Sequence, residues 1–83
     1  MGYRISYKQS VARDLARLDS QTQRRILDKI DAELTGDPLR HPGLKGPYAG
    51  LYRLRVGDYR VIYTVLEEEV PVLRIGHRRE IYR

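Results

Sequence analysis

The stretch YRLRVGDYRVIY, residues 52–63, decides the fold of this 83-residue chain. On both sides of Gly57-Asp58, tyrosine and aliphatic residues alternate with arginines. A period of two is typical of β-strands, and a two-residue loop with glycine first is typical of a type II′ hairpin turn. The pattern therefore predicts two antiparallel strands, Leu51–Val56 and Tyr59–Leu66.

The two faces of this hairpin differ in chemistry. The predicted core face carries Tyr52, Leu54, Val56, Tyr59, Val61 and Tyr63. The other face, which we call the arginine face, carries Arg53, Arg55 and Arg60. Arg55 is predicted to lie opposite Arg60, and like charges so placed destabilise a sheet by up to about 1 kcal/mol. This face has no Asp or Glu between residues 51 and 66, which favours a phosphate site over a solvated face of paired charges.

A third strand, Val70–Gly76, is predicted after a turn at Glu67–Glu69. A three-residue turn puts Leu73 and Ile75 in the core and adds Arg74 and Arg78 to the arginine face. A turn of two or four residues would reverse those faces. Burying the aliphatic side chains costs less than burying an arginine, so the three-residue turn is favoured.

Two helices are predicted before the hairpin. Apolar residues recur at helical spacing after Ser10, a candidate N-cap, and again after Ser20–Gln23, a capping-box signature. Residues 36–50, rich in Gly and Pro, form a loop. Residues 3–7 alternate as a short strand. The chain, residues 1–83, is therefore predicted to be a single α+β domain ordered β-α-α-β-β-β, with both helices packed on one face of a small antiparallel sheet.

Composition narrows the functional classes. The net charge is +5 and arginines outnumber lysines thirteen to three, which suits a polyanionic partner because the guanidinium binds phosphate through two nitrogens. The absence of cysteine excludes a disulfide scaffold and a thiolate zinc site. No apolar run approaches the ~20 residues of a membrane span, so a cytoplasmic protein without a membrane partner is expected.

Three motifs carry a family resemblance: LKG at residues 44–46, YRLRVGDYRVIY at residues 52–63 and IGHRREIY at residues 75–82. Together with the strand-helix-helix opening, they resemble the RelE branch of the RelE/ParE toxin superfamily. The resemblance implies a RelE-like toxin of a type II toxin–antitoxin system. Matching motif positions implies catalytic roles for Arg53, Arg55, Arg60, Arg78 and Tyr82, and RNA contacts by Lys45, Arg74, His77 and Arg79.

The activity implied by the resemblance is that of an mRNA interferase, which cleaves messenger RNA on the ribosome without a metal or cofactor. A ribose 2′-OH attacks the adjacent phosphorus, and fixed guanidinium groups suit the growing negative charge. Arginine is a poor general base. His77 is the nearby residue type that titrates close to neutrality, although the favoured register points it toward the core, where a structural role is as plausible. Tyr82 either stacks on an RNA base or packs the tail onto the sheet. His41 is interpreted as a solvated loop residue.

The sequence is also compatible with two other functions. ParE-type relatives share the fold and inhibit DNA gyrase without cleaving RNA, but they commonly lack the full basic-plus-tyrosine set that this sequence retains. A non-catalytic RNA-binding module would need aromatic residues along the arginine face, and the tyrosines of the hairpin are predicted to face the core. The partner implied for a toxin is a cognate antitoxin, acidic and partly disordered alone. A RelE-type toxin would also bind the ribosome and messenger RNA.

Overall fold

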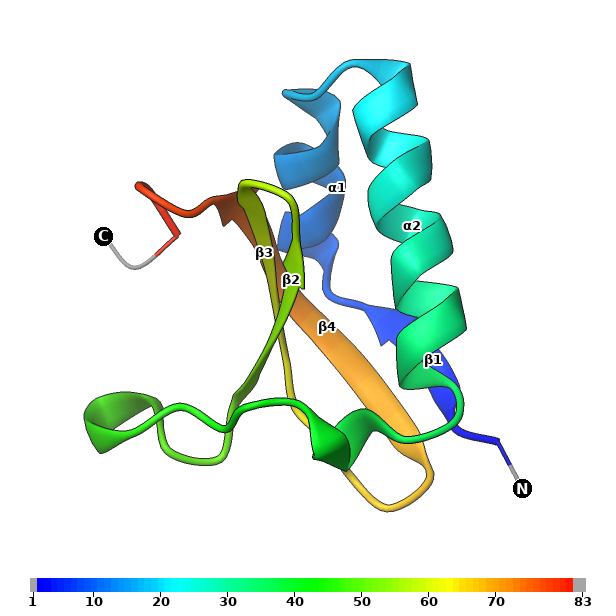
Figure 1. The fold of residues 1–83 in the computed structure, drawn as a ribbon, viewed down its shortest axis with the longest axis vertical. Coiled ribbons are helices and arrows are strands. Elements are labelled where there is room, and N and C mark those ends of the chain that lie inside the picture. The colour runs from blue at the N-terminus through cyan, green and yellow to red at the C-terminus, as the bar shows by residue number, and fades with distance from the viewer. Residues whose placement is uncertain (1, 82–83) are drawn as a thin grey trace.

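A computed structural model of the chain describes residues 2–81 (Figure 1). These residues form the helices α1 (Gln9–Ala16) and α2 (Ser20–Leu34) and the strands β1 (Arg4–Tyr7), β2 (Tyr52–Val56), β3 (Tyr59–Tyr63) and β4 (Glu69–His77). Two short 3-10 helices, η1 (Pro38–Arg40) and η2 (Gly46–Tyr48), lie between α2 and β2. The predicted α+β class and the order of helices and strands are confirmed.

The sheet is mixed, with the strand order β1-β4-β3-β2. The pairs β2–β3 and β3–β4 are antiparallel, whereas β1 runs parallel to β4 from Arg4 opposite Glu69 to Tyr7 opposite Val72. The prediction of a purely antiparallel sheet is therefore wrong. Parallel neighbours need a long crossover connection, and here both helices and the β2–β3 hairpin supply it. Local alternation shows hairpins but carries no information on such distant pairing.

Both helices lie on the same side of the sheet, and the core fills the space between the two layers (Figure 1). The helices contribute Val11, Ile26, Ile30 and Leu34, and the strands contribute Leu54, Val56, Val61, Tyr63, Val70, Val72 and Ile75. The Tyr63 hydroxyl donates a hydrogen bond of 2.5 Å to the Pro38 carbonyl, which ties the loop after α2 to the sheet. Within residues 2–81, no helix is long and apolar enough to cross a membrane.

The start of α1 differs from the predicted one. Lys8 occupies the N-cap position, and Ser10 lies one residue inside the helix. The Ser10 hydroxyl donates to the carbonyl of Leu73 at 3.2 Å. Its polar group therefore links α1 to β4 instead of capping the helix.

The connection between the helices also uses its polar residues differently. Asp19 is the N-cap of α2, and Ser20 is the first helical residue, so the predicted capping box does not form. The Gln23 amide instead donates to the carbonyls of Leu15 and Leu18, at 2.7 and 2.9 Å. These bonds satisfy carbonyls that the end of α1 leaves open, and they fix the two helices side by side.

The β2–β3 hairpin has the predicted register. Tyr52 faces Tyr63 and Arg55 faces Arg60, and the Tyr52 and Tyr63 rings stack with centroids 5.6 Å apart. Gly57 has φ +60, the left-handed value that the first loop residue of a type II′ turn requires. The pairing of the arginine face is therefore confirmed.

The β3–β4 connection is shorter than predicted. Leu66 and Glu69 exchange backbone hydrogen bonds of 2.9 and 3.0 Å, which leaves a two-residue turn and makes the predicted three-residue turn wrong. A bulge at Leu73 then shifts the register by one residue, so that Ile62 faces Arg74. At the bulge, Leu73 has no partner on β3, and this residue, which was predicted to lie in the core, is only half-buried.

Candidate functional site

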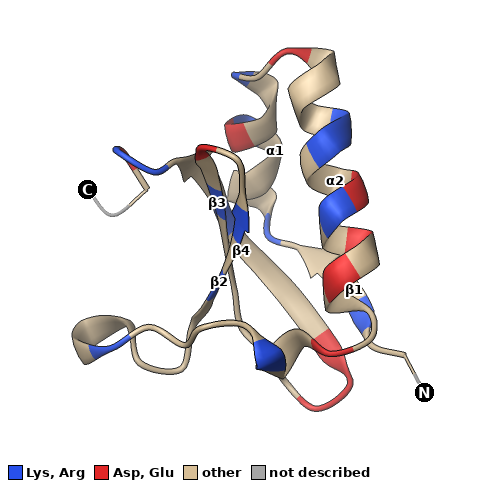
Figure 2. Ribbon diagram, viewed as in Figure 1, with Lys and Arg blue, Asp and Glu red and all other residues tan. Residues whose placement is uncertain are grey.

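The arginine face is the side of the sheet opposite the helices. Lys and Arg positions are marked along β2 and β3 and in the segment after β4 (Figure 2). Arg55 and Arg60 are direct cross-strand partners, and Gly76 of β4 lies on the far side of Arg60. Arg53 faces Ile62, which is buried although it lies on this face. Cross-strand partners project to the same side of a sheet, so these residues share one surface.

Arg53 and Arg55 carry the uncompensated charge of this surface. Arg55 is exposed and Arg53 is half-buried. Neither residue forms an ion pair with a carboxylate anywhere within residues 2–81. The two guanidinium groups are therefore available to an anion from outside the chain.

Arg60 has a different environment from its neighbour Arg55. It is 9% exposed, and its guanidinium donates to the carbonyls of Gly57 and Tyr59, both at 3.1 Å. The side chain folds back onto the hairpin turn, so Arg60 is shielded from solvent although its neighbour Arg55 is exposed. Arg60 thus combines a positive charge with a fixed position, as an electrostatic catalyst requires.

Arg78 lies in the turn that follows β4. Its backbone N–H donates to the carbonyl of Asp58 at 2.8 Å, which places it beside the hairpin turn. Its side chain and that of Asp58 are 48% and 68% exposed and 4.0 Å apart, so the ion pair between them is weak. The Arg78 guanidinium is accessible next to the arginine face.

Arg74 belongs to this face by register but not by its contacts. Its guanidinium Nε is 3.1 Å from Oδ2 of Asp14 in α1. The same carboxylate oxygen accepts the backbone N–H of Ile75 at 2.9 Å. Asp14 therefore covers the free edge of β4 beyond β1 and holds Arg74 toward the helix layer.

His77 is packed rather than free. Its ring meets that of Tyr59 edge to face, with centroids 5.7 Å apart, and its Nδ1 accepts the backbone N–H of Arg79 at 3.2 Å. Arg79 itself is exposed, as is Lys45 at the start of η2. Tyr82 lies outside the described residues, and its role stays a prediction.

The interpretation of His41 as a solvated loop residue is wrong. Its side chain is 14% exposed, and Nε2 lies 3.6 Å from Oε1 of Glu33 in α2. The backbone N–H of Arg53 donates to the Pro42 carbonyl at 3.1 Å, so the segment after His41 runs beside β2. This edge borders a cavity of about 300 Å³ lined by Lys29, Glu33, His41, Pro42, Arg53, Leu54 and Arg55. The sequence held one indication that this segment is extended: Pro42 favours extended backbone at the residue before it, which is His41.

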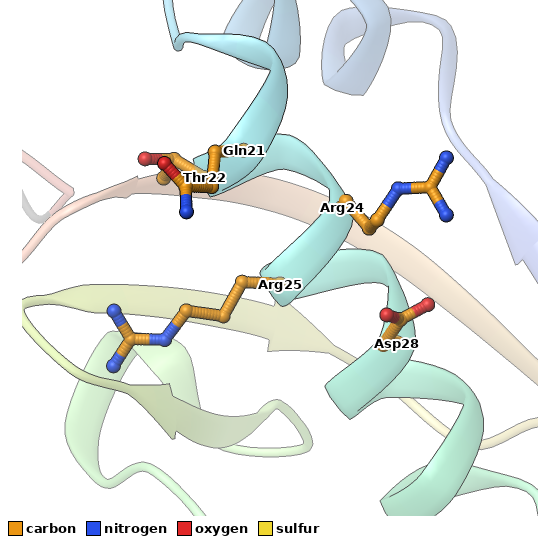
Figure 3. A pocket seen from close by; sticks show the side chains of 5 residues that line it. All are labelled: Gln21, Thr22, Arg24, Arg25 and Asp28. Carbon is orange, nitrogen blue, oxygen red and sulfur yellow. The ribbon is translucent and has the colours of Figure 1, made fainter.

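A second hollow, of about 590 Å³, lies on α2 and is lined by Gln21, Thr22, Arg24, Arg25 and Asp28 (Figure 3). Arg24 and Arg25 point in opposite directions from the helix. Arg25 extends toward the hairpin, where a methyl group on Gly57 would lie 3.0 Å from its terminal nitrogen. Because one helix alone lines this hollow and its charged groups diverge, the arginine face is the stronger candidate site.

Comparison with known proteins agrees with this fold. Residues 5–82 match the model of the family described as ParE toxin of type II toxin–antitoxin system, parDE. The chain belongs to this toxin family. It is 31% identical to toxin RelG of Mycobacterium tuberculosis, with 100% of this chain and 99% of the relative covered. It is 30% identical to toxin RelE of the same organism, with 98% and 87% covered.

Solved structures give the same result for this member of the toxin family. The RelBE2 toxin–antitoxin complex of M. tuberculosis contains a chain that matches with a TM-score of 0.87 and 27% identity, covering 94% of this chain and 100% of that one. The archaeal RelE–RelB complex of Pyrococcus horikoshii matches with a TM-score of 0.75 and 31% identity, covering 96% and 99%. The predicted membership of the RelE branch of the superfamily is confirmed.

Proposed function

We propose that this toxin is a ribosome-dependent RNA endonuclease that cleaves messenger RNA on its arginine face and so stops translation. The observation that carries the proposal is the pairing of Arg55, exposed and without a carboxylate partner among residues 2–81, with the buried and fixed Arg60. Two arginines at facing strand positions, one fixed and one exposed, supply positive charge that suits a phosphate in a transition state.

The reaction is an internal transfer in the RNA. The ribose 2′-oxygen loses its proton and bonds to the adjacent phosphorus, the bond from phosphorus to the 5′-oxygen breaks, and that oxygen takes up a proton. The products are a 2′,3′-cyclic phosphate and a 5′-hydroxyl. Arg53, Arg55, Arg60 and Arg78 stabilise the added negative charge on phosphorus oxygens, and Tyr82 stacks on a neighbouring base.

The proposed function includes a partner that restrains the toxin. The RelBE2 and P. horikoshii structures are complexes of a toxin with an antitoxin. By similarity, this chain binds a cognate antitoxin of acidic composition that folds on binding. The net charge is +5, and Arg53 and Arg55 have no carboxylate partner within the described residues, so the chain is electrostatically complementary to such a partner.

The test compares the purified toxin with its Arg55→Ala variant on ribosomes loaded with a defined messenger. Wild type should yield fragments with cyclic phosphate and 5′-hydroxyl ends, and Arg55→Ala should slow the cleavage about 100- to 1,000-fold. Arg24→Ala is the matched control, because it removes the same charge from the exposed surface of α2. Equal cleavage by Arg55→Ala and Arg24→Ala would refute the assignment of the arginine face.

A second function is favoured by one observation, since the matching family model describes ParE toxins. A ParE-type toxin of this fold would inhibit DNA gyrase without cutting RNA. Pulse-labelling of protein and DNA synthesis after induction separates the two functions, because the nuclease stops translation first. Binding to ribosomes should also weaken with salt, with a slope near −0.7 in log K per phosphate contacted, if single-stranded contacts dominate. Early arrest of DNA synthesis without ribosome binding would favour gyrase.

A further inference from the structure

The turn after β4 contains one buried residue among charged, exposed neighbours. Arg78, Arg79 and Glu80 are exposed, whereas Ile81 is only 8% exposed. Burial of one isoleucine side chain stabilises a segment by about 1.5–3 kcal/mol, which is large for a turn this short. The turn is therefore packed against the domain, and burial of the Ile81 side chain holds it there.

Ile81 packs against the backbone of Gly76, which has no side chain; we call this position the seat of Ile81. A methyl group added to Gly76 would lie 3.1 Å from Cδ1 of Ile81, closer than carbon atoms pack without displacement. The φ angle of Gly76 is not in the left-handed region, so its lack of a side chain, and not its backbone freedom, is what the site uses. Gly76 faces Arg60 across β3–β4, which places Ile81 on the arginine face.

Backbone contacts complete the attachment of the turn. The N–H groups of Glu80 and Ile81 donate to the His77 carbonyl at 2.9 and 3.0 Å, and the Arg79 N–H donates to Nδ1 of His77. The Arg78 N–H reaches the Asp58 carbonyl on the hairpin. The exposed ion pair to Asp58 is too weak to orient the Arg78 side chain. The position of Arg78 therefore depends on how the whole turn is seated.

We propose that Gly76 and Ile81 form a latch that seats the C-terminal turn on the arginine face and so positions Arg78 for catalysis. This inference rests on the proposed RNA cleavage. Both are positioning residues, since the role needs no contact between them and RNA. A displacement of about 1 Å in a catalytic group can cost about 100-fold in rate, so a residue remote from the phosphate can have a large effect.

The test begins with Gly76→Ala, which fills the seat. It should slow RNA cleavage about 10- to 100-fold at saturating ribosomes. Gly36→Ala is the matched control, because a methyl group at Gly36 meets nothing within 4 Å. The variant Ile81→Val lacks Cδ1, the atom that the new methyl group would strike. The double variant Gly76→Ala/Ile81→Val should therefore recover most of the lost rate, which a general loss of stability would not allow.

A second measurement, the rate of trypsin cleavage in the turn, tests the attachment of the turn without RNA. Trypsin cuts after arginine, and release of the turn should speed cleavage after Arg78 and Arg79 in Gly76→Ala but not in Gly36→Ala. Thermal melting of each variant confirms that the domain stays folded. Unchanged trypsin cleavage in Gly76→Ala overturns the latch, and faster trypsin cleavage with an unchanged RNA cleavage rate overturns its positioning role. If wild type cuts no RNA, the proposed function fails, while trypsin still reports on the latch.

Discussion

The two faces of the β2–β3 hairpin alternate along the same strands, yet they differ in burial and in charge pairing. On the helix side, Leu54 and Val61 are 2% and 0% exposed and pack in one cluster with Ile30 of α2. On the arginine face, Arg60 is buried, whereas Arg55 is exposed and has no carboxylate partner within residues 2–81. The helix side is packed without a ligand, whereas Arg53 and Arg55 on the arginine face have no carboxylate partner among residues 2–81.

This difference separates stability from function in a small domain. A sheet selected for stability alone would set opposite charges across β2 and β3, since facing arginines repel. The helix side supplies the burial that lets the chain tolerate this repulsion. Residues that break a local rule without an evident gain in stability mark functional sites. Variants on the two faces should therefore fail in different ways.

The largest expected effect is on the helix side. Ile30 is fully buried between α2 and the sheet, and Ile30→Ala should lower the free energy of unfolding by about 2–5 kcal/mol. That is a large part of the total stability of a domain this size. Urea unfolding followed by circular dichroism measures it. An unchanged midpoint would show that the helix side is not the stabilising face.

The next effect divides two facing arginines. Arg55→Ala should reduce RNA cleavage strongly and leave the free energy of unfolding unchanged, or raise it by up to about 1 kcal/mol as repulsion is relieved. Arg60→Ala should reduce cleavage as well but also lower the free energy of unfolding by about 1–3 kcal/mol, because the turn carbonyls lose a charged donor. Urea unfolding and cleavage assays on both variants check this. Equal stability of the two would contradict the buried position of Arg60.

Local sequence rules predicted the hairpin because its turn and its alternation agree. They failed at the β3–β4 connection, where two errors cancelled. The turn is one residue shorter than predicted, and the bulge at Leu73 adds that residue back, so Ile75 still faces Val61 in the core. The parallel pairing of β1 with β4 could not be predicted, since it joins residues more than sixty positions apart.

For the candidate site, the sequence predicted which arginines share a face but not the environment of each side chain. Period-two alternation placed Arg53, Arg55 and Arg60 on one face, as the structure has them. It could not show that Arg60 folds back on its own turn, because that depends on side-chain conformation. Nor could it show that Asp14 binds Arg74, because helix α1 and strand β4 meet only in the folded chain.

A smaller effect, again on the helix side, depends on pH. Burial, and then the charges of Tyr52 and Asp37, raise the pKa of Tyr63 above its ordinary value of 10.0. The folded state therefore keeps this proton more tightly than the unfolded state, and stability should be constant below about pH 10 and fall above it. Tyr63→Phe should cost about 1 kcal/mol at neutral pH, through the lost bond to Pro38, and should reduce the fall at high pH. Urea unfolding of wild type and Tyr63→Phe at pH 7 and pH 11 tests both expectations. An equal fall in stability at pH 11 in the two proteins would contradict the role of the Tyr63 hydroxyl.

The smallest expected effect is at Arg74, where register and contacts disagree. Arg74 faces Ile62 on the arginine face, but its guanidinium is bound by Asp14 and half of its side chain is exposed. Arg74→Gln should change the free energy of unfolding by about 1 kcal/mol or less, because half of the arginine side chain is exposed and the nearly buried Asp14 keeps its bond from the Ile75 N–H. RNA cleavage should change by no more than about twofold, the equivalent of a surface substitution. A loss as large as that of Arg55→Ala would show that Arg74 leaves Asp14 when RNA binds. In that case Asp14→Asn, which frees the guanidinium beforehand, should raise the affinity for RNA, whereas a merely structural pair would give no such gain.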